Sequence, residues 1–446
     1  MSWARIYPPV VQPETLRACL ALVPVKGLKI KQMDIKGAYL NGILQETIYM
    51  KQPEGFEDGT GRVCKLIKTL YGLKQSGREW NKQLDEKLRN HGYKRLTSDP
   101  CAYVRWDGDN VAIMTVWVDD LLLFTSNEAM MEHMKESIES EWQATDLGEP
   151  SKILGIEISI MPEYLRISQE KYIENLLRRE NMAEANPVGM PLDPNVKIGP
   201  NPVHNEPNWS NSYAKLLGEL QYLANTTRPD ISYAINKLAS YTANPSLEHY
   251  GSLKHILRYL AGTRDYGITY RKSISPNNET NIVHGLAKNY GPADNGEDSL
   301  FHGFTDAAFA NADDYKSTTG YVFLASEGAI TWKSKRQTII AMSSTESEYV
   351  TLSEAGREAF WLRNLYDELG FPQMGPTVIK SDNEGSVILS HNPQFHARTK
   401  HIEIHHHWIR DLVNDKILDV QSCHDPEQTA DILTKPLPKP KHQRHR

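Results

Sequence analysis

The sequence predicts an α/β protein of two or three domains, in which a mixed α/β region, a helical region and a second mixed α/β region follow one another. A chain of 446 residues with 39% hydrophobic content can bury several cores, at roughly 100 to 200 residues per domain. In the helical region, from Ser212 to about Gly262, apolar side chains recur at three- and four-residue spacings, and Pro229 and Pro245 divide it into shorter helices. Stretches rich in Asn, Pro and Gly at 186–211 and 272–299 separate the three regions.

Charge and cysteine usage narrow the classes of function. The net charge of -6 argues against a generally basic nucleic-acid binder, yet residues 62–95 contain ten Lys or Arg against three acids, and residues 435–446 contain five against none. Four cysteines without a C-x-x-C pair indicate neither a zinc ribbon nor a disulfide framework. The short apolar run 19–25 suits neither a signal peptide nor a spanning helix, so we expect an intracellular protein, cytoplasmic or nuclear, that binds no membrane.

Two apolar runs meet at a pair of acids in AIMTVWVDDLLLF (112–124), which predicts a β-hairpin with Asp119 and Asp120 at its turn. Asp-Asp is also a favoured turn pair, so the hairpin alone leaves a purely structural role open. A third acid, Asp34, lies in the strand-like segment KQMDIKGAYL, and three converging carboxylates suit a pair of Mg²⁺ ions in phosphoryl transfer. The segment LYGLKQSGREW between these acids mixes positive charge with aromatic faces, as nucleic-acid contacts do.

A second set of acids follows the stretch at 272–299. HGFTDAAFA places Asp306 in a short strand, a hairpin is expected after it, and SSTESEYVTLSEAGREAFWLRNLYDELG then predicts one long helix that begins near Ser344 or Thr345. Thr345 and Glu348 fit a capping box, in which Glu348 would only cap the helix. Glu348 also heads the apolar stripe of this helix, so we take it as the candidate ligand and Glu346 as its solvated neighbour.

Two further acids complete this set. Asp382 follows a predicted strand at its carboxyl end, a common location for α/β active sites, although it also suits a helix N-cap. Asp431 lies in a short helix that Pro436 stops. With Asp306 and Glu348 these acids would form a second two-metal site. The histidines at 401, 405, 406 and 407 have partial zinc spacing, but no Cys or third ligand stands at a suitable distance, so we favour an amphipathic helix there.

The order of the first motifs carries a resemblance. QMDIKGAYLNG, IYMKQPEGF, LYGLKQSGREW, VWVDDLLLF and LGIEI follow one another as in copia-type retrotransposon reverse transcriptases, which this region resembles. The resemblance implies that Asp34, Asp119 and Asp120 bind two Mg²⁺ ions, with Mn²⁺ as a substitute. It implies that Tyr39 crowds a ribose 2'-hydroxyl and so favours deoxynucleotides. It assigns contact with the template or the incoming nucleotide to Lys74, Gln75 and Arg78.

The later motifs extend the resemblance. GFTDAAFA, STTGYVFL, SSTESEY, SDNEGSV, RTKHIEIHHHWIR and ADILTKPL resemble the copia-type ribonuclease H domain in the same order. This implies cleavage of the RNA strand of an RNA-DNA hybrid by two further Mg²⁺ ions held by Asp306, Glu348, Asp382 and Asp431. His424 is a loop histidine that could assist turnover or product release.

The resemblance also names the parts of the fold. It implies a right-hand polymerase with fingers and palm over 1–185, a helical thumb or connection over 186–271 and a linker over 272–300. A ribonuclease H-like α/β domain with a mixed sheet over 301–438 and a basic tail over 439–446 would follow. The partners implied are an RNA template, a DNA primer and product, an RNA-DNA hybrid, deoxynucleoside triphosphates and other parts of the polyprotein, in the cytoplasm or in virus-like particles.

Two other functions stay open. The strands that family polymerases place in the fingers before YPPVVQPETLRACLAL are largely absent here, so the chain could be a catalytically inactive remnant that retains its fold and nucleic-acid binding. It could also be a nuclease whose polymerase half is only a scaffold. The presence of all seven candidate metal-binding acids argues against decay.

Overall fold

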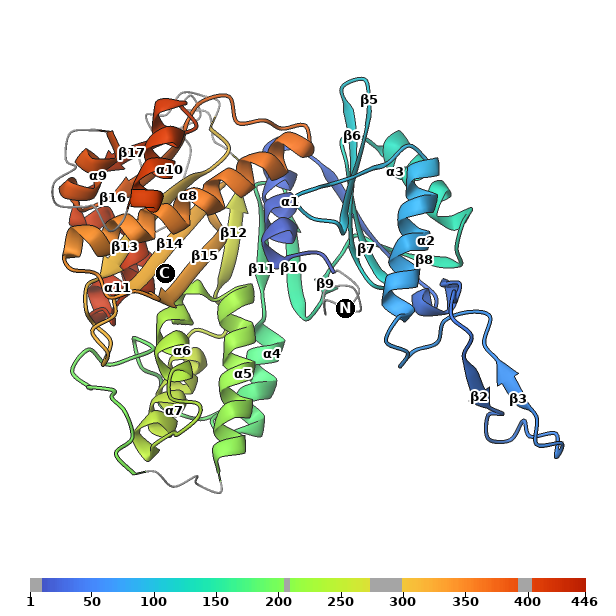
Figure 1. The fold of residues 1–446 in the computed structure, drawn as a ribbon, viewed down its shortest axis with the longest axis horizontal. Helices are drawn as coiled ribbons and strands as arrows, with labels where there is room; N and C mark the ends of the chain where they lie inside the picture. The colour runs from blue at the N-terminus through green and yellow to red at the C-terminus, as the bar shows by residue number, and fades with distance from the viewer. Residues whose placement is uncertain (1–9, 204–208, 273–298, 392–402) are drawn as a thin grey trace. The chain divides into compact units, whose positions relative to one another are not determined.

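A computed structural model of the chain describes residues 10–203, 209–272, 299–391 and 403–446, without the side chains of 403–407 and 425 (Figure 1). Nearly all of the predicted linker therefore lies outside the described residues. The chain divides into two compact units, Met1–Ser151 with Glu368–Phe371, and Lys152–Asp367 with Pro372–Arg446. Within the described ranges, no helix has the length and apolar character needed to cross a bilayer. The finer division into five parts stays a prediction.

The first unit is built on an antiparallel sheet with the strand order β4-β5-β6-β7-β1-β8. Helices α2 and α3 bury Leu84 and Met134 in one core with the strands. The strands of this sheet are β1 (Lys29–Ile35), β4 (Lys94–Arg95), β5 (Ala102–Asp107), β6 (Asn110–Trp117), β7 (Asp120–Thr125) and β8 (Ala144–Gly148). The helices are α1 (Pro13–Lys26), α2 (Ser76–Asn90) and α3 (Glu128–Glu139), and a separate ribbon pairs β2 (Tyr49–Lys51) with β3 (Val63–Lys65).

The predicted hairpin over 112–124 is confirmed. Strands β6 and β7 pair antiparallel from Ala112 opposite Thr125 to Trp117 opposite Asp120, so Val118 and Asp119 form the turn. Its apolar runs are buried, because both faces of these strands are covered. The acids at the turn are left at one end of a buried hairpin.

The second unit begins with an antiparallel sheet of order β12-β11-β10-β9 and a group of helices. The predicted breaks at the two prolines are confirmed, since α5 ends at Thr226 before Pro229, and α7 begins at Leu247 after Pro245. The strands are β9 (Lys152–Ile153), β10 (Ile156–Met161), β11 (Tyr164–Ser168) and β12 (Gly267–Arg271). The helices are α4 (Glu170–Arg179), α5 (Ser210–Thr226), α6 (Ser232–Ala239) and α7 (Leu247–Ala261), with the short 3-10 helix η3 (Pro229–Ile231).

The same unit contains a mixed sheet of order β15-β14-β13-β16-β17, in which β13 pairs antiparallel with β14 and parallel with β16. The predicted α/β class is thereby confirmed. The strands are β13 (His302–Ala308), β14 (Thr318–Ala325), β15 (Gly328–Arg336), β16 (Thr377–Ser381) and β17 (Leu418–Ser422). The helices are α8 (Ser344–Glu368), α9 (Glu384–His391), α10 (Glu403–Asn414) and α11 (Lys439–His445), with the 3-10 helices η5 (Asp425–Glu427) and η6 (Thr429–Leu433).

Helix α8 crosses one face of this mixed sheet (Figure 1). The hydroxyl of Thr351 on this helix lies 3.0 Å from that of Thr319 on β14. Gln337, which follows β15, donates a hydrogen bond to the Ser347 carbonyl at 2.9 Å. The apolar stripe predicted for this helix is confirmed. Its fully buried members are Leu352, Ala355, Ala359, Leu362 and Tyr366.

Residues 439–446, expected as a basic tail, contain helix α11. His442 is buried on this helix, and its Nε2 lies 3.3 Å from the carbonyl oxygen of Asp230 in η3. The ring of His442 also meets Tyr259 of α7 edge-on at 5.4 Å. The basic segment is therefore packed against the helical region through a buried histidine.

Candidate active sites

The first three acids lie at one end of neighbouring strands. Asp34 on β1 is the Cα partner of Asp120 on β7, so their side chains leave the same face of the sheet. Asp119 belongs to the adjoining turn, and its carbonyl oxygen accepts a hydrogen bond from the Ile35 amide at 2.9 Å. The fold thus brings together the three acids that were separated in the sequence.

The turn that carries Asp119 has an unusual backbone. Val118 adopts φ 56°, a left-handed conformation that a β-branched residue rarely takes and that costs about 1 to 3 kcal/mol. Trp80 of α2 is 2% exposed and donates its indole N–H to the Val118 carbonyl at 3.1 Å. Helix α2 therefore stabilises the strained turn through this hydrogen bond.

Polar neighbours orient the two turn acids. The hydroxyl of Tyr71 donates to Oδ2 of Asp119 at 2.8 Å, and the amide of Gln32 donates to Oδ1 of Asp120 at 3.3 Å. Partial burial raises the pKa of both acids, and the negative charge of Asp34 adds to this shift while the two hydrogen bonds oppose it. A nearby positive charge, such as that of a metal ion, would therefore stabilise their charged forms.

The residues predicted to contact the nucleotide or the template differ in their exposure and in their partners. Tyr39 lies in the 3-10 helix η2 (Ala38–Asn41), with its ring centroid 5.0 Å from that of Tyr71. Lys74 is exposed and Gln75 forms the N-cap position of α2. Arg78 is paired with Glu46 at 2.7 Å and with Glu79 at 2.6 Å, so its guanidinium already has two acidic partners. The sequence indicated Tyr71 only as an aromatic face of the LYGLKQSGREW motif, and its hydrogen bond to Asp119 was not predicted.

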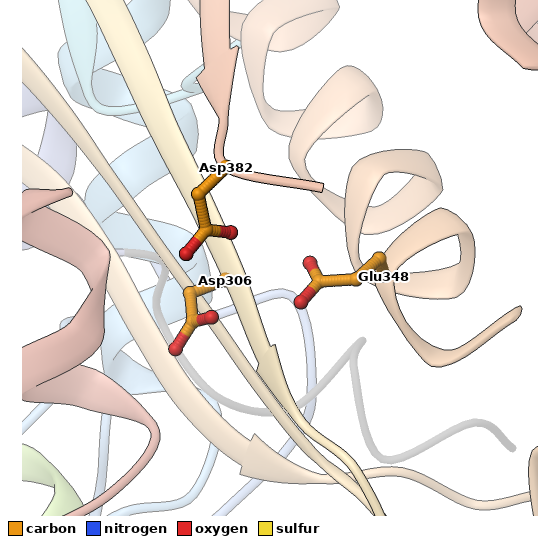
Figure 2. A group of neighbouring side chains, drawn as sticks. All are labelled: Asp306, Glu348 and Asp382. Atoms are coloured by element: carbon orange, nitrogen blue, oxygen red, sulfur yellow. The ribbon is translucent and has the colours of Figure 1, made fainter. Parts of the chain in front are cut away.

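The second set of acids comes from separate elements and forms a tighter group. Asp306 lies on β13, Glu348 on α8, and Asp382 directly after β16, and one oxygen of each lies within 4.8 Å of the others. Figure 2 shows the three side chains around a common space, with Glu348 directed from its helix toward Asp306 and Asp382. Asp306 is 2% exposed and Glu348 is 6% exposed. In the part of the chain that the structure describes, the acids 34, 119 and 120 do not form such a group.

Two assignments for helix α8 were wrong. The predicted capping box of Thr345 and Glu348 is not formed, because Ser343 caps the helix and accepts a hydrogen bond from the Glu346 amide at 3.1 Å. Glu346 is not a solvated neighbour, since it is 8% exposed and its Oε2 accepts from the Met342 amide at 2.7 Å. Glu348 therefore does not cap the helix, and its carboxylate lies with those of Asp306 and Asp382.

Asp382 is likewise free of capping. The next residue, Asn383, caps α9, and its side chain accepts a hydrogen bond from the Ser386 amide at 2.9 Å. Asp382 is less buried than Asp306 and Glu348. It thus forms the side of the group that is most open to solvent.

Asp431 lies beside Asp306 and is paired with two lysines. It lies in η6 and is fully buried, with Oδ1 2.5 Å from Nζ of Lys435 and Oδ2 2.5 Å from Nζ of Lys441. The segment that contains η6 packs closely against Gly320 of β14. Only a glycine fits there, since a Cβ at position 320 would lie 2.4 Å from a methyl carbon of Thr434. Gly320 is also the cross-strand partner of Asp306. Sequence reasoning missed both lysines, although Lys435 stands four residues after Asp431.

Burial dominates the electrostatics of the group. It raises the pKa of Asp306, a shift that Lys435 opposes and Asp431 reinforces. Burial and then repulsion from Asp306 raise the pKa of Glu348. Although burial opposes ionisation of Asp431, Lys435 and Lys441 hold its pKa below the ordinary value.

The group fits a hard divalent cation. Oxygen ligands are what Mg²⁺ prefers, and burying several carboxylates is costly unless a cation compensates them. Among the described residues, Oε2 of Glu348 has no hydrogen-bond partner, so this buried oxygen is available as a ligand. Asp306, Glu348 and Asp382 could therefore hold a metal ion.

The histidines add little to either site. His424 is exposed in the loop after β17. His401 and the side chains of residues 405–407 lie outside the described residues. The expected helix is present there as α10.

Comparisons with known proteins identify the family. Residues 1–194 match the family described as reverse transcriptase (RNA-dependent DNA polymerase). A retrovirus-related Pol polyprotein from transposon TNT 1-94 of Nicotiana tabacum is 37% identical over 452 residues, which cover 99% of this chain and 32% of that relative. A putative Ty5-1 transposon protein of Saccharomyces cerevisiae is 30% identical over 73% of this chain and 100% of its own length. The chain belongs to the copia-type family of retrotransposon Pol polyproteins.

This copia-type chain spans about a third of the length of the tobacco polyprotein, and 28% of the similar RE1 polyprotein of Arabidopsis thaliana, to which it is 36% identical. Among solved structures, a foamy viral protease-reverse transcriptase in complex with an RNA/DNA hybrid matches with a TM-score of 0.49 and 12% identity, over 92% of this chain and 45% of that one. The family membership rests on the sequence relatives. The resemblance to copia-type retrotransposons that the order of the motifs indicated is confirmed.

Proposed function

We propose that the chain is an RNA-directed DNA polymerase with ribonuclease H activity, which uses two separate acid sites. The observation that supports this most is the presence of one acid cluster on each of two sheets, in two different compact units. In this proposal the first sheet is the palm, the helices of the second unit are the thumb or connection, and the mixed sheet belongs to a ribonuclease H-like domain.

In the polymerase site, Asp34, Asp119 and Asp120 would hold two Mg²⁺ ions, with Mn²⁺ as a substitute. Bound cations would stabilise the charge that develops on the reacting phosphate oxygens. Tyr71 and Gln32 keep the two turn carboxylates in orientation. The substrates would be deoxynucleoside triphosphates, an RNA template and a DNA primer.

The nucleotide would lie against a wall of two aromatic rings. The packed rings of Tyr39 and Tyr71 lie beside Asp119, where the sugar of a nucleotide bound through its phosphates would come. A ring at that place would exclude a 2'-hydroxyl. Lys74, Gln75 and Arg78 would contact the template or the triphosphate, for which Arg78 must exchange one of its acidic partners.

In the nuclease site, Asp306, Glu348 and Asp382 would hold a Mg²⁺ ion, and Asp306 with Asp431 would complete the place for a second. The substrate would be the RNA strand of an RNA-DNA hybrid, the product of the first site. The buried carboxylates would fix the positions of the cations, and the phosphate would enter on the side of the more open Asp382.

The unmodified full chain tests this proposal. It is incubated with Mg²⁺, deoxynucleoside triphosphates and an end-labelled DNA primer on an RNA template, and separately with a hybrid labelled in its RNA strand. We expect extension of the primer and hydrolysis of the RNA. Hydrolysis without extension would indicate a nuclease with a scaffold polymerase, and the absence of both would favour a catalytically inactive remnant.

A further inference from the structure

A lysine lies between two buried acids of the nuclease site. Nζ of Lys435 is 2.5 Å from Oδ1 of Asp431 and 3.5 Å from Oδ2 of Asp306. The side chains of these acids are 0% and 3% exposed, whereas that of Lys435 is 41% exposed. The ammonium group thus reaches from solvent to the space between the two carboxylates.

An ordinary surface ion pair does not account for this arrangement. Lys435 and Asp431 have the i, i+4 spacing of helical surface pairs, which contribute only tenths of a kcal/mol. Arg89 and Asp85 form such a pair elsewhere, with 59% and 18% of their side chains exposed. Asp431 instead is fully buried, and Lys435 also approaches an acid that lies far away in the sequence.

The second lysine has a different position. Lys441 contacts Oδ2 of Asp431 and lies on α11, next to His442, which is buried against η3 and Tyr259. Helix α11 therefore fixes one oxygen of Asp431 through Lys441. Lys435 is the more exposed of the two lysines, at 41% against 29%, and its Nζ also lies 3.5 Å from Oδ2 of Asp306. Its greater exposure makes Lys435 the candidate for a lysine that moves away from the acids.

We propose that Lys435 is a built-in cation of the nuclease site, and that a second divalent ion binds between Asp306 and Asp431 only by displacing its ammonium group. The first ion, held by Asp306, Glu348 and Asp382, would need no such displacement, because among the described residues no ion pair joins Lys435 to Glu348 or Asp382 and Lys435 lies nearer to Asp431 than to Asp306. This inference rests on the proposed nuclease function. Lys435 acts here as a positioning residue, which holds the carboxylate of Asp431 in place until the second ion arrives.

The number of bound Mn²⁺ ions tests this inference without relying on activity. Electron paramagnetic resonance counts the ions bound by the full chain as Mn²⁺ is added, and the Asp306→Asn variant reports ions bound elsewhere. Lys435→Met and Lys435→Gln remove the charge, whereas Lys435→Arg retains it. Lys316→Met is the matched control, since Lys316 pairs with Asp314 at 3.3 Å and has no contact with the acid group in the described structure.

We expect Lys435→Met and Lys435→Gln to bind the second ion at about tenfold lower Mn²⁺ concentration, because a unit charge about 4 Å away no longer opposes it. Lys435→Arg and Lys316→Met should bind as the unmodified chain does. An unchanged or weaker second ion in both uncharged variants would overturn the inference, as would equal behaviour of the Arg and Met variants. Hydrolysis of a labelled hybrid by the unmodified chain tests the nuclease function separately. If the chain does not hydrolyse the hybrid, the nuclease function is overturned, while the number of bound Mn²⁺ ions still tests the displacement of Lys435.

Discussion

The two acid sites of this chain are assembled in different ways. The acids of the first site come from two neighbouring strands and the turn between β6 and β7, and each turn acid has a polar neighbour that donates a hydrogen bond to it. The acids of the second site come from β13, α8, the end of β16 and η6, and most of them are buried.

The two sites therefore differ in how many oxygen ligands for a metal ion the protein itself brings together. Three carboxylates of the second site already converge within 4.8 Å, with a buried oxygen of Glu348 left for a ligand. The first site is half-open, and it leaves room for the phosphates of a nucleotide to supply further oxygen ligands. Changes in packing should therefore affect the second site most, and changes in the turn backbone the first.

Among changes that leave every candidate metal ligand in place, the largest effect is expected from Gly320→Ala. The added Cβ would lie 2.4 Å from a methyl carbon of Thr434, so η6 must shift and move Asp431 away from Asp306. Hydrolysis of an RNA-DNA hybrid should fall about 100-fold, since a misplacement of about 1 Å costs that much. Primer extension should stay unchanged. Gly218→Ala on α5 is the control, since a Cβ there meets nothing within 4 Å, and equal hydrolysis by both variants would contradict the role of Gly320.

A smaller effect, on stability, is expected from Glu348→Gln. Burial raises the pKa of Glu348 above its ordinary value of 4.5, so the metal-free folded state binds a proton more readily than the unfolded state does. The contribution of this proton to the free energy of unfolding is fully present below pH 4.5. It is lost as the pH rises through the raised pKa of Glu348 in the folded state. At pH 8.5 in the presence of a chelator, the variant should be more stable by on the order of 2 kcal/mol, and at pH 4 the two should agree.

Urea unfolding at the two pH values measures this difference. Glu346→Gln is the control, because Glu346 is buried on the same helix but bonds to the Met342 amide instead of joining the acid group. It should lower stability at both pH values. A difference between Glu348→Gln and the unmodified chain that does not grow with pH would contradict the cost of burying this carboxylate.

The smallest effect is expected from Trp80→Phe. The change keeps an aromatic ring in the core but removes the N–H that bonds to Val118, which is worth about 1 kcal/mol. The strained turn should relax, and single-nucleotide primer extension should fall about tenfold while hydrolysis stays unchanged. Trp142→Phe alters the partner ring of Trp80, 5.5 Å away, and within the described structure Trp142 donates no hydrogen bond to Val118. An equal loss of extension in both variants would point to core packing instead of the turn.

The features that could be predicted depend on short-range patterns. The hairpin over 112–124 follows from two apolar runs around two acids, and the buried stripe of α8 follows from spacing along one helix. The caps could not be chosen this way. Ser343, Ser344 and Thr345 are all suitable N-cap residues, and only the backbone direction before α8 selects Ser343.

The partners of the acids depend on contacts between distant segments. Lys441 reaches Asp431 because α11 packs against η3 through His442, and η6 reaches Asp306 because Gly320 has no side chain. Tyr71 reaches Asp119 from a loop that precedes α2. None of these approaches leaves a periodic pattern in the sequence, so candidate ligands could be named while their ionic and hydrogen-bond partners could not.

The separation of the two sites is the central claim, and one pair of variants tests it most directly. Asp119→Asn and Asp306→Asn are assayed in the full chain for primer extension on RNA and for hydrolysis of a labelled hybrid, from the same preparations and after melting curves show that both are folded. We expect Asp119→Asn to lose extension by at least about 1,000-fold and retain hydrolysis, and Asp306→Asn to do the reverse, since each carboxylate would hold the cations of one site only. Loss of both activities from either single change would contradict the account.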